Sequence, residues 1–299
     1  MAVLVVLAVL AAGCAPSGPP SLSAGRIRVV AAENQYGDVA AQIGGDYVQV
    51  RSVMSNPNTD PHSYEVNASL ARSIDSAAVI VQNGLGYDSF MDTIESATGR
   101  PGRRIIDVQK LLHVPSSTPN PHLWYDPRTM PAVAAELAAE FSAVEPQHAS
   151  YFAANASRFD ASLQPWLAAT ARLRTDHPGD AVAATEPVAD YLLQSAGLTN
   201  VTPPSFLLAV MNGVDPAPQD LTSVGELISH HRIRALIYNR QVTDSVTAAF
   251  LSRARRAGIP LVGVYETMPT PGYDYQRWML AETEAIDRAV SSGISTGTL

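Results

Sequence analysis

The sequence predicts an α/β protein of two Rossmann-like lobes, each with a mostly parallel sheet flanked by helices. The chain has 299 residues, more than one compact domain usually contains, and its 46% hydrophobic residues are enough for two cores. Short β-branched runs alternate with amphipathic stretches in two separate series. An Ala-rich stretch of helical period lies between these series and predicts a connection between the lobes.

The first series predicts an N-terminal lobe over residues 26–144. Apolar runs separated by plausible helices predict strands at 27–31, 48–54, 78–82 and 104–108. Alternation of this kind is typical of a parallel sheet covered by helices.

The second series predicts a C-terminal lobe over residues 179–299. Its expected strands and helices come from apolar runs at 181–184, 235–238 and 261–265 and from helical patterns at 243–257 and 273–289.

Residues 145–178 are predicted to form one long helix that connects the lobes. Pro165 lies inside this pattern, where it lacks a backbone donor and clashes with the preceding turn. The sequence leaves open whether Pro165 kinks the helix or divides it.

Residues 1–14 are predicted to be a lipoprotein signal. The apolar run from Ala2 to Ala12 is too short to span a bilayer, and it ends in small residues before Cys14. Residues 15–25, rich in Pro, Gly and Ser, are predicted to be a flexible tether. No Lys or Arg precedes the apolar run, which is compatible with a start upstream of Met1. We therefore expect Cys14 to carry lipid that anchors the protein at the outer face of the cell membrane.

The composition excludes several classes of function and of site. The net charge is −8 with 16% charged residues, so no basic field exists to attract nucleic acid. Cys14 is the single cysteine, so a lipidated Cys14 leaves no thiol for a disulfide or a thiolate metal site. Nitrogen and oxygen ligands must therefore hold any metal.

His62 and His122 are the first two candidate metal ligands, and each directly follows a proline. Asp60 and Glu65 lie near enough in sequence to His62 to accept its other ring N–H, which fixes the tautomer of a ligating histidine. A single loop histidine is more often structural or solvated, but the repeated Pro-His pattern in one lobe favours ligation by both.

Glu186 and Glu266 are the other two candidates, because each lies just after a predicted strand, where α/β sheets usually bind ligands. We expect Thr185 to cap a helix that starts near Pro187, with the positive helix end keeping Glu186 ionised. The alternative readings are a capping carboxylate for Glu186 and a plain loop carboxylate for Glu266.

Over nearly its whole length the chain resembles the metal-binding solute receptors of bacterial ABC importers for zinc and manganese. The resemblance rests on five segments in order: Asp60-Pro61-His62-Ser63-Tyr64-Glu65, Asn83-Gly84-Leu85-Gly86, Pro121-His122-Leu123-Trp124-Tyr125-Asp126-Pro127, Thr185-Glu186-Pro187 and Glu266-Thr267-Met268-Pro269. It implies a monomer that holds one ion between its lobes and delivers it to a membrane permease driven by an ATPase.

The resemblance also implies which lobe supplies each ligand. His62 and His122 come from the first lobe, and Glu186 and Glu266 from the second. Many zinc-type members carry a histidine at the position of Glu186, and many members carry aspartate at the position of Glu266. Asn120 stands where an aspartate is common.

The ligand set bears on which metal is bound. Two imidazoles with two carboxylates suit Mn(II) or Fe(II) when a carboxylate is bidentate, whereas Zn(II) prefers tetrahedral sites. Zn(II) outcompetes Mn(II) at most nitrogen and oxygen sites. The sequence therefore favours manganese over zinc by a small margin.

Two other classes of protein compete with the receptor. A zinc-dependent metallohydrolase keeps an open position for water and often shows a His-Glu-x-x-His helix, which this sequence lacks. A purely adhesive or structural lipoprotein needs no convergent ligands and would gain no stability from metal. We expect capture and release of metal, without catalysis.

Overall fold

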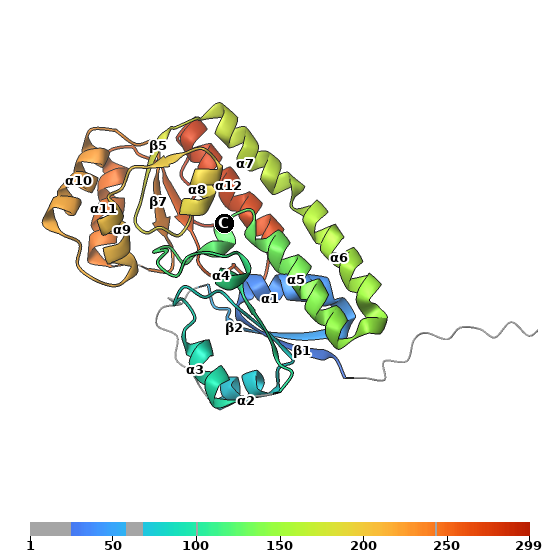
Figure 1. Ribbon diagram of the computed structural model, residues 1–299. Coiled ribbons are helices and arrows are strands. Elements are labelled where there is room, and N and C mark those ends of the chain that lie inside the picture. The colour runs from blue at the N-terminus through green and yellow to red at the C-terminus, as the bar shows by residue number, and fades with distance from the viewer. Residues whose placement is uncertain (1–24, 58–67, 100, 243) are drawn as a thin grey trace, which may run out of the picture.

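The structure, a computed structural model, describes residues 25–57, 68–99, 101–242 and 244–299. Within these ranges the chain forms two four-stranded sheets, and every pair of neighbouring strands is parallel. Helices flank both sheets (Figure 1). The predicted fold class of two α/β lobes is confirmed.

The first sheet has the strand order β2-β1-β3-β4. Its strands are β1 (Ile27–Glu33), β2 (Val48–Met54), β3 (Val79–Gln82) and β4 (Arg104–Asp107). The helical segments of this lobe are α1 (Asn34–Gly44), η1 (Gly45–Tyr47), α2 (Ala68–Ser76), α3 (Phe90–Ala97), α4 (Val108–Leu111), η3 (Leu123–Tyr125) and α5 (Thr129–Val144).

Alternate side chains of β1 enter two different cores. Val29 and Ala31 belong to the large core shared with α1 and α5, while Val30 and Ala32 belong to a smaller core formed with α2 and α3. Successive residues of a strand point to opposite faces of the sheet. The nearly continuous apolar sequence of β1 is therefore explained by burial on both faces, as in other parallel sheets.

The second sheet has the strand order β6-β5-β7-β8. Its strands are β5 (Ala181–Ala184), β6 (Thr199–Asn200), β7 (Leu236–Asn239) and β8 (Leu261–Val264). Its helices are α8 (Asp190–Ser195), α9 (Pro204–Met211), α10 (Pro218–Ser229), α11 (Ser245–Arg256) and α12 (Tyr275–Ser292). The sequence did not predict β6, because a strand of two residues has no readable period.

The connection between the lobes consists of η4 (Pro146–His148), α6 (Ala149–Ser162) and α7 (Gln164–Asp176). The predicted single helix is thus divided at Leu163, two residues before Pro165. The division is slight, since Leu163 keeps right-handed helical backbone angles of φ −76° and ψ −14°. The two helices follow each other along one side of the molecule (Figure 1).

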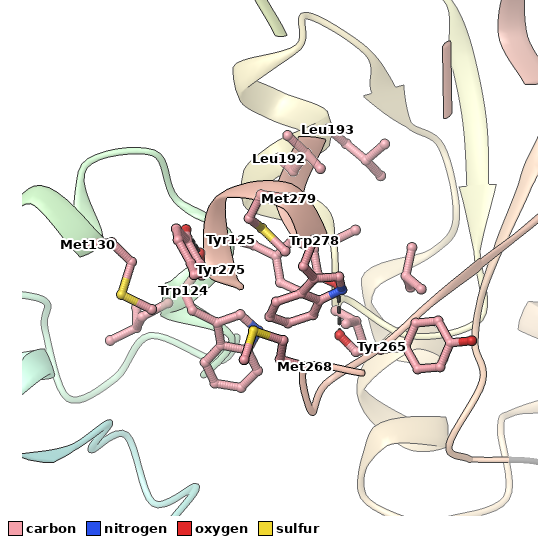
Figure 2. Close-up of a cluster of buried hydrophobic side chains, with 14 of the residues drawn as sticks. Trp124, Tyr125, Met130, Leu192, Leu193, Tyr265, Met268, Tyr275, Trp278 and Met279 are labelled. Carbon is pink, nitrogen blue, oxygen red and sulfur yellow. Dashed lines mark hydrogen bonds between the residues drawn. The ribbon is translucent and has the colours of Figure 1, made fainter. Parts of the chain in front are cut away.

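Helix α12 belongs to the second lobe but also contacts α1 of the first lobe and α7 of the connection. Its buried aromatic side chains meet those of η3, and the hydroxyl of Tyr275 donates to the carbonyl of Trp124 at 2.6 Å (Figure 2). Trp166 of α7 donates to Thr283 of α12 at 3.0 Å. The lobes therefore share one continuous core. Among the described residues, no helix is both long and apolar enough to cross a membrane.

Candidate metal centre

His122 is fully buried in the loop that precedes η3. Its Nδ1 lies 2.7 Å from Oδ1 of Asn120, and its backbone N–H donates to the same oxygen at 3.1 Å. The amide of Asn120 has a fixed orientation, because its Nδ2 donates to the carbonyl of Pro187 at 2.8 Å. Nδ1 of His122 therefore carries a proton, and in the neutral imidazole this tautomer presents the lone pair of Nε2 to a ligand.

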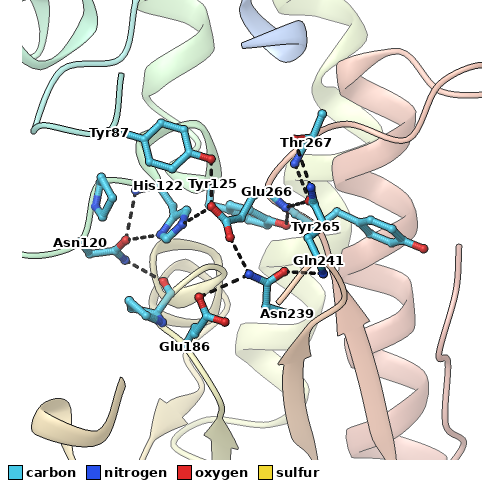
Figure 3. Close-up of polar contacts among 12 residues, drawn as sticks. Tyr87, Asn120, His122, Tyr125, Glu186, Asn239, Gln241, Tyr265, Glu266 and Thr267 are labelled. Atoms are coloured by element: carbon cyan, nitrogen blue, oxygen red, sulfur yellow. Dashed lines mark hydrogen bonds and ion pairs between the residues drawn. The ribbon is translucent and has the colours of Figure 1, made fainter. Parts of the chain in front are cut away.

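Glu266 lies opposite His122 and comes from the loop after β8 (Figure 3). Its Oε2 is 3.2 Å from Nε2 of His122 and accepts a hydrogen bond of 2.8 Å from the hydroxyl of Tyr87. Burial first, and then the charge of Glu266, raise the pKa of Tyr87 well above its usual value. The phenol therefore stays protonated and donates to the carboxylate across the lobe boundary.

Asn239, the last residue of β7, joins the two carboxylates of the second lobe. Its buried amide nitrogen donates to Oε1 of Glu266 at 2.5 Å and to Oε2 of Glu186 at 3.3 Å (Figure 3). One uncharged side chain thus holds two buried carboxylates on the same side of His122.

Gln241 holds the backbone of Glu266 and Thr267 in place. Its Oε1 accepts from the backbone amides of Glu266 and Thr267 at 2.6 and 2.8 Å. The backbone N–H of Gln241 in turn donates to Oδ1 of Asn239 at 2.9 Å. The loops that follow β7 and β8 are therefore held together as one unit.

The structure places His122 and Glu266 in contact and links Glu186 to Glu266 through Asn239. His62 and Cys14 lie outside the described residues. Within the described ranges, no three His, Cys, Asp or Glu side chains converge closely enough to hold an ion. The amide of Asn239 lies between the two carboxylates, which accounts for the separation of Glu186 from His122 and Glu266.

The predicted helix cap at Thr185 is wrong. Helix α8 begins at Asp190, after a bend and a turn, and its N-cap is Ala189. The hydroxyl of Thr185 instead accepts a hydrogen bond of 3.2 Å from the backbone N–H of Asn239. Hydrogen bonding to the neighbouring strand therefore replaces capping, and Glu186 is held by Asn239 and not by a helix dipole.

Sequence reasoning missed the supporting roles of Tyr87, Asn239 and Gln241. An asparagine at the end of a buried strand carries no period or motif, so burial of an amide at the ligand-binding edge was the one signal present. Three other histidines lie away from this cluster: His230 and His231 are exposed, and His177 lies 3.0 Å from Asp180.

The sequence matches the family of the periplasmic zinc-uptake complex component A over residues 29–289. The chain belongs to this family. Membership confirms capture of a divalent metal for uptake, and it confirms that this family member is a transport receptor and not an enzyme.

Relatives of this zinc-uptake family member include two lipoproteins named for manganese. The manganese-binding lipoprotein MntA of Bacillus subtilis is 25% identical over 260 residues, which are 82% of this chain and 81% of MntA. The manganese ABC transporter substrate-binding lipoprotein PsaA of Streptococcus pneumoniae is 19% identical over 256 residues, 81% of each chain.

Solved structures show the same fold. FpvC of Pseudomonas aeruginosa in complex with Mn2+ has a TM-score of 0.72 at 21% identity, over 90% of this chain and 99% of that chain. The laminin-binding protein Lbp of Streptococcus pyogenes has a TM-score of 0.72 at 16% identity, over 90% of this chain and 100% of Lbp.

Proposed function

We propose that His122, Glu186 and Glu266, together with His62, bind one divalent transition metal ion as cargo for import. The observation that carries this proposal is the contact between Nε2 of His122 and Oε2 of Glu266 at 3.2 Å. In the neutral tautomer of His122 with its proton on Nδ1, two electron-rich atoms face each other and both are fully buried. Such a pair is stable with a cation between its atoms, and imidazole with carboxylate is a donor set for first-row divalent metals.

The ion that this receptor delivers is, in our proposal, manganese. Two carboxylates beside imidazole allow more than four oxygen and nitrogen ligands, which suits Mn(II) better than the tetrahedral preference of Zn(II). The named function of MntA and PsaA supports the same metal. Zn(II) remains the competitor to measure, because it binds nitrogen and oxygen ligands more tightly than Mn(II) at most sites.

The receptor acts, in this proposal, at the outer face of the cell membrane. Lipid on Cys14 anchors it, residues 15–25 serve as tether, and a permease with its ATPase receives the ion. Residues 26–144 and 179–299 form the two lobes, with 145–178 between them. The lipoprotein names of MntA and PsaA support the anchor. Metabolic labelling with palmitate, lost on Cys14→Ala, is the expected result.

The first experiment is elemental analysis of the purified protein, followed by competitive titration of the metal-free protein with Mn(II) and Zn(II). We expect one equivalent of ion, lost in His122→Ala and retained in His230→Ala. His230 is exposed at the end of α10, so it is a matched control for the loss of one imidazole. Unchanged binding by His122→Ala would remove His122 from the site and overturn the proposal.

A further inference from the structure

Glu282 is a fully buried carboxyl group on α12 that lies outside the proposed ligand set. Its Oε1 accepts from the indole N–H of Trp278 at 2.7 Å and from the backbone amide of Tyr265 at 3.1 Å. Its Oε2 lies 2.5 Å from the hydroxyl oxygen of Tyr125. Glu282 thus contacts the residue that precedes Glu266 and a residue of the short helix that follows His122.

The contacts of the Tyr125 hydroxyl indicate whether Glu282 is protonated. The same hydroxyl oxygen lies 2.7 Å from the backbone carbonyl of Tyr265. A phenol has one proton, so it can donate to the carbonyl or to Glu282 but not to both. If Glu282 were ionised, one of these two short contacts would join two acceptors without a proton.

A protonated Glu282 satisfies every group in this cluster. Oε2–H donates to the oxygen of Tyr125, the hydroxyl of Tyr125 donates to the carbonyl of Tyr265, and Oε1 accepts from Trp278 and from the amide of Tyr265. Buried polar groups are stable when each has its partner, whereas one left without a partner destabilises the fold.

The surroundings of Glu282 also favour its protonated form. Burial raises the pKa of Glu282 from 4.5 to about 8, against the smaller lowering effects of hydrogen bonds from Tyr125, Trp278 and the backbone of Tyr265. None of these described groups is a cation. Helix α7, which packs on α12, presents Trp166 to Thr283, also uncharged.

We propose that Glu282 is a neutral carboxylic acid in the folded protein and that it positions the His122 segment against the Glu266 segment. This role rests on the metal site proposed above. Tyr125 and Tyr265 come from opposite sides of the lobe boundary, and each is close in sequence to one ligand. The proton on Glu282 lets one side chain bind both, so His122 and Glu266 keep their separation without a charge in the core.

The first test measures thermal unfolding of the metal-free protein against pH. An acid whose pKa is higher in the folded than in the unfolded state loses stability as pH rises between those two values. Glu282→Gln can form the same hydrogen bonds without titrating. We therefore expect its melting temperature to rise relative to that of the unchanged protein as the pH increases from 4.5 to about 8. The gain should be on the order of 2 °C per pH unit.

The matched control is Glu284→Gln, which makes the same chemical change on the exposed face of the same helix. Its unfolding curve should run parallel to that of the unchanged protein. A Glu282→Gln curve that also runs parallel would show that Glu282 is ionised and would overturn the neutral acid. This test uses no metal, so it reports on the protonation of Glu282 even if the proposed ligand set is wrong.

The second test measures Mn(II) affinity by titration. Glu282→Gln should bind within about twofold of the unchanged protein, while Glu282→Ala and Tyr125→Phe should lose about tenfold or more, as loss of a supporting residue does at other metal sites. Tyr125→Phe keeps the ring in the core, so it reports on the hydroxyl even if Glu282→Ala fails to fold.

Two results of the titration would overturn the positioning role. One is full affinity in Tyr125→Phe, and the other is a loss in Glu282→Gln as large as in Glu282→Ala. A failure of the metal site itself is separate, because it appears as unchanged binding by His122→Ala.

Discussion

Nε2 of His122 lies 3.2 Å from Oε2 of Glu266, and both side chains are fully buried. The two residues come from different lobes, so their contact joins the lobes at the proposed site. One nitrogen donor and one oxygen donor of different lobes therefore lie within reach of a single ion, as the proposed ligand set requires.

Replacing either carboxylate by its amide should weaken Mn(II) binding. Glu266→Gln and Glu186→Gln keep the side-chain shape but remove the charge that a hard cation requires. We expect each to cost more than the roughly 10–100-fold that loss of a supporting residue costs. Isothermal titration measures the effect, with Glu226→Gln on the exposed face of α10 as control. Full affinity in Glu186→Gln would remove that residue from the site.

Replacing Asn120 by alanine should weaken metal binding without unfolding the protein. The Oδ1 of Asn120 holds the proton of His122 on Nδ1, so its loss frees the imidazole to rotate or to change tautomer. We expect affinity to fall by about 10–100-fold. Asn212→Ala, at an exposed helix end, should bind normally. Equal affinity in the two variants would mean that Asn120 does not orient the ligand.

Replacing Asn239 by alanine should leave the two buried carboxylates of the site without their shared donor. Removing a hydrogen bond to a charged group costs about 1.5–3 kcal/mol, so the metal-free protein should unfold at a lower temperature. Mn(II) affinity should fall as well, because Glu186 and Glu266 lose their common orientation. A variant with normal melting and normal affinity would contradict the bridging role.

Metal should stabilise the folded protein by mass action. At a free Mn(II) concentration about 100 times the dissociation constant, the gain is about 2.7 kcal/mol. Thermal unfolding with Mn(II), and again after addition of a chelator, measures this gain and its reversal. His122→Ala should show neither. Equal melting temperatures with and without metal in the unchanged protein would favour the adhesive or structural lipoprotein.

The sequence predicted the framework of the fold because every strand except β6 contains a short apolar run. It singled out His122, Glu186 and Glu266 because they occur in recognisable segments, and their role as metal ligands stays a prediction. The sequence could not show whether Pro165 kinks or divides the helix, because a proline is compatible both with a kink and with the first turn of a new helix.

The supporting residues could not be predicted for a different reason. Asn239 and Glu282 act through partners that are distant in sequence, and nothing in their neighbours signals those contacts. Thr185 shows the converse error. A threonine two residues before a proline is a good helix cap by local rules. The hydroxyl of Thr185 instead accepts a hydrogen bond from the backbone N–H of Asn239 on the adjacent strand.

Asn34, at the start of α1, forms two hydrogen bonds with one residue of the other lobe. Its Nδ2 donates to the carbonyl of Met268 at 2.8 Å, and its Oδ1 accepts from the amide of Met268 at 3.0 Å. The side chain thus replaces a peptide group of a neighbouring strand. Separating the lobes here would exchange both hydrogen bonds of Met268 for hydrogen bonds to water, at a net cost of about 0.5–1.5 kcal/mol each. A permease that pulls the lobes apart must supply this work in addition to the work of stripping the ion from its ligands.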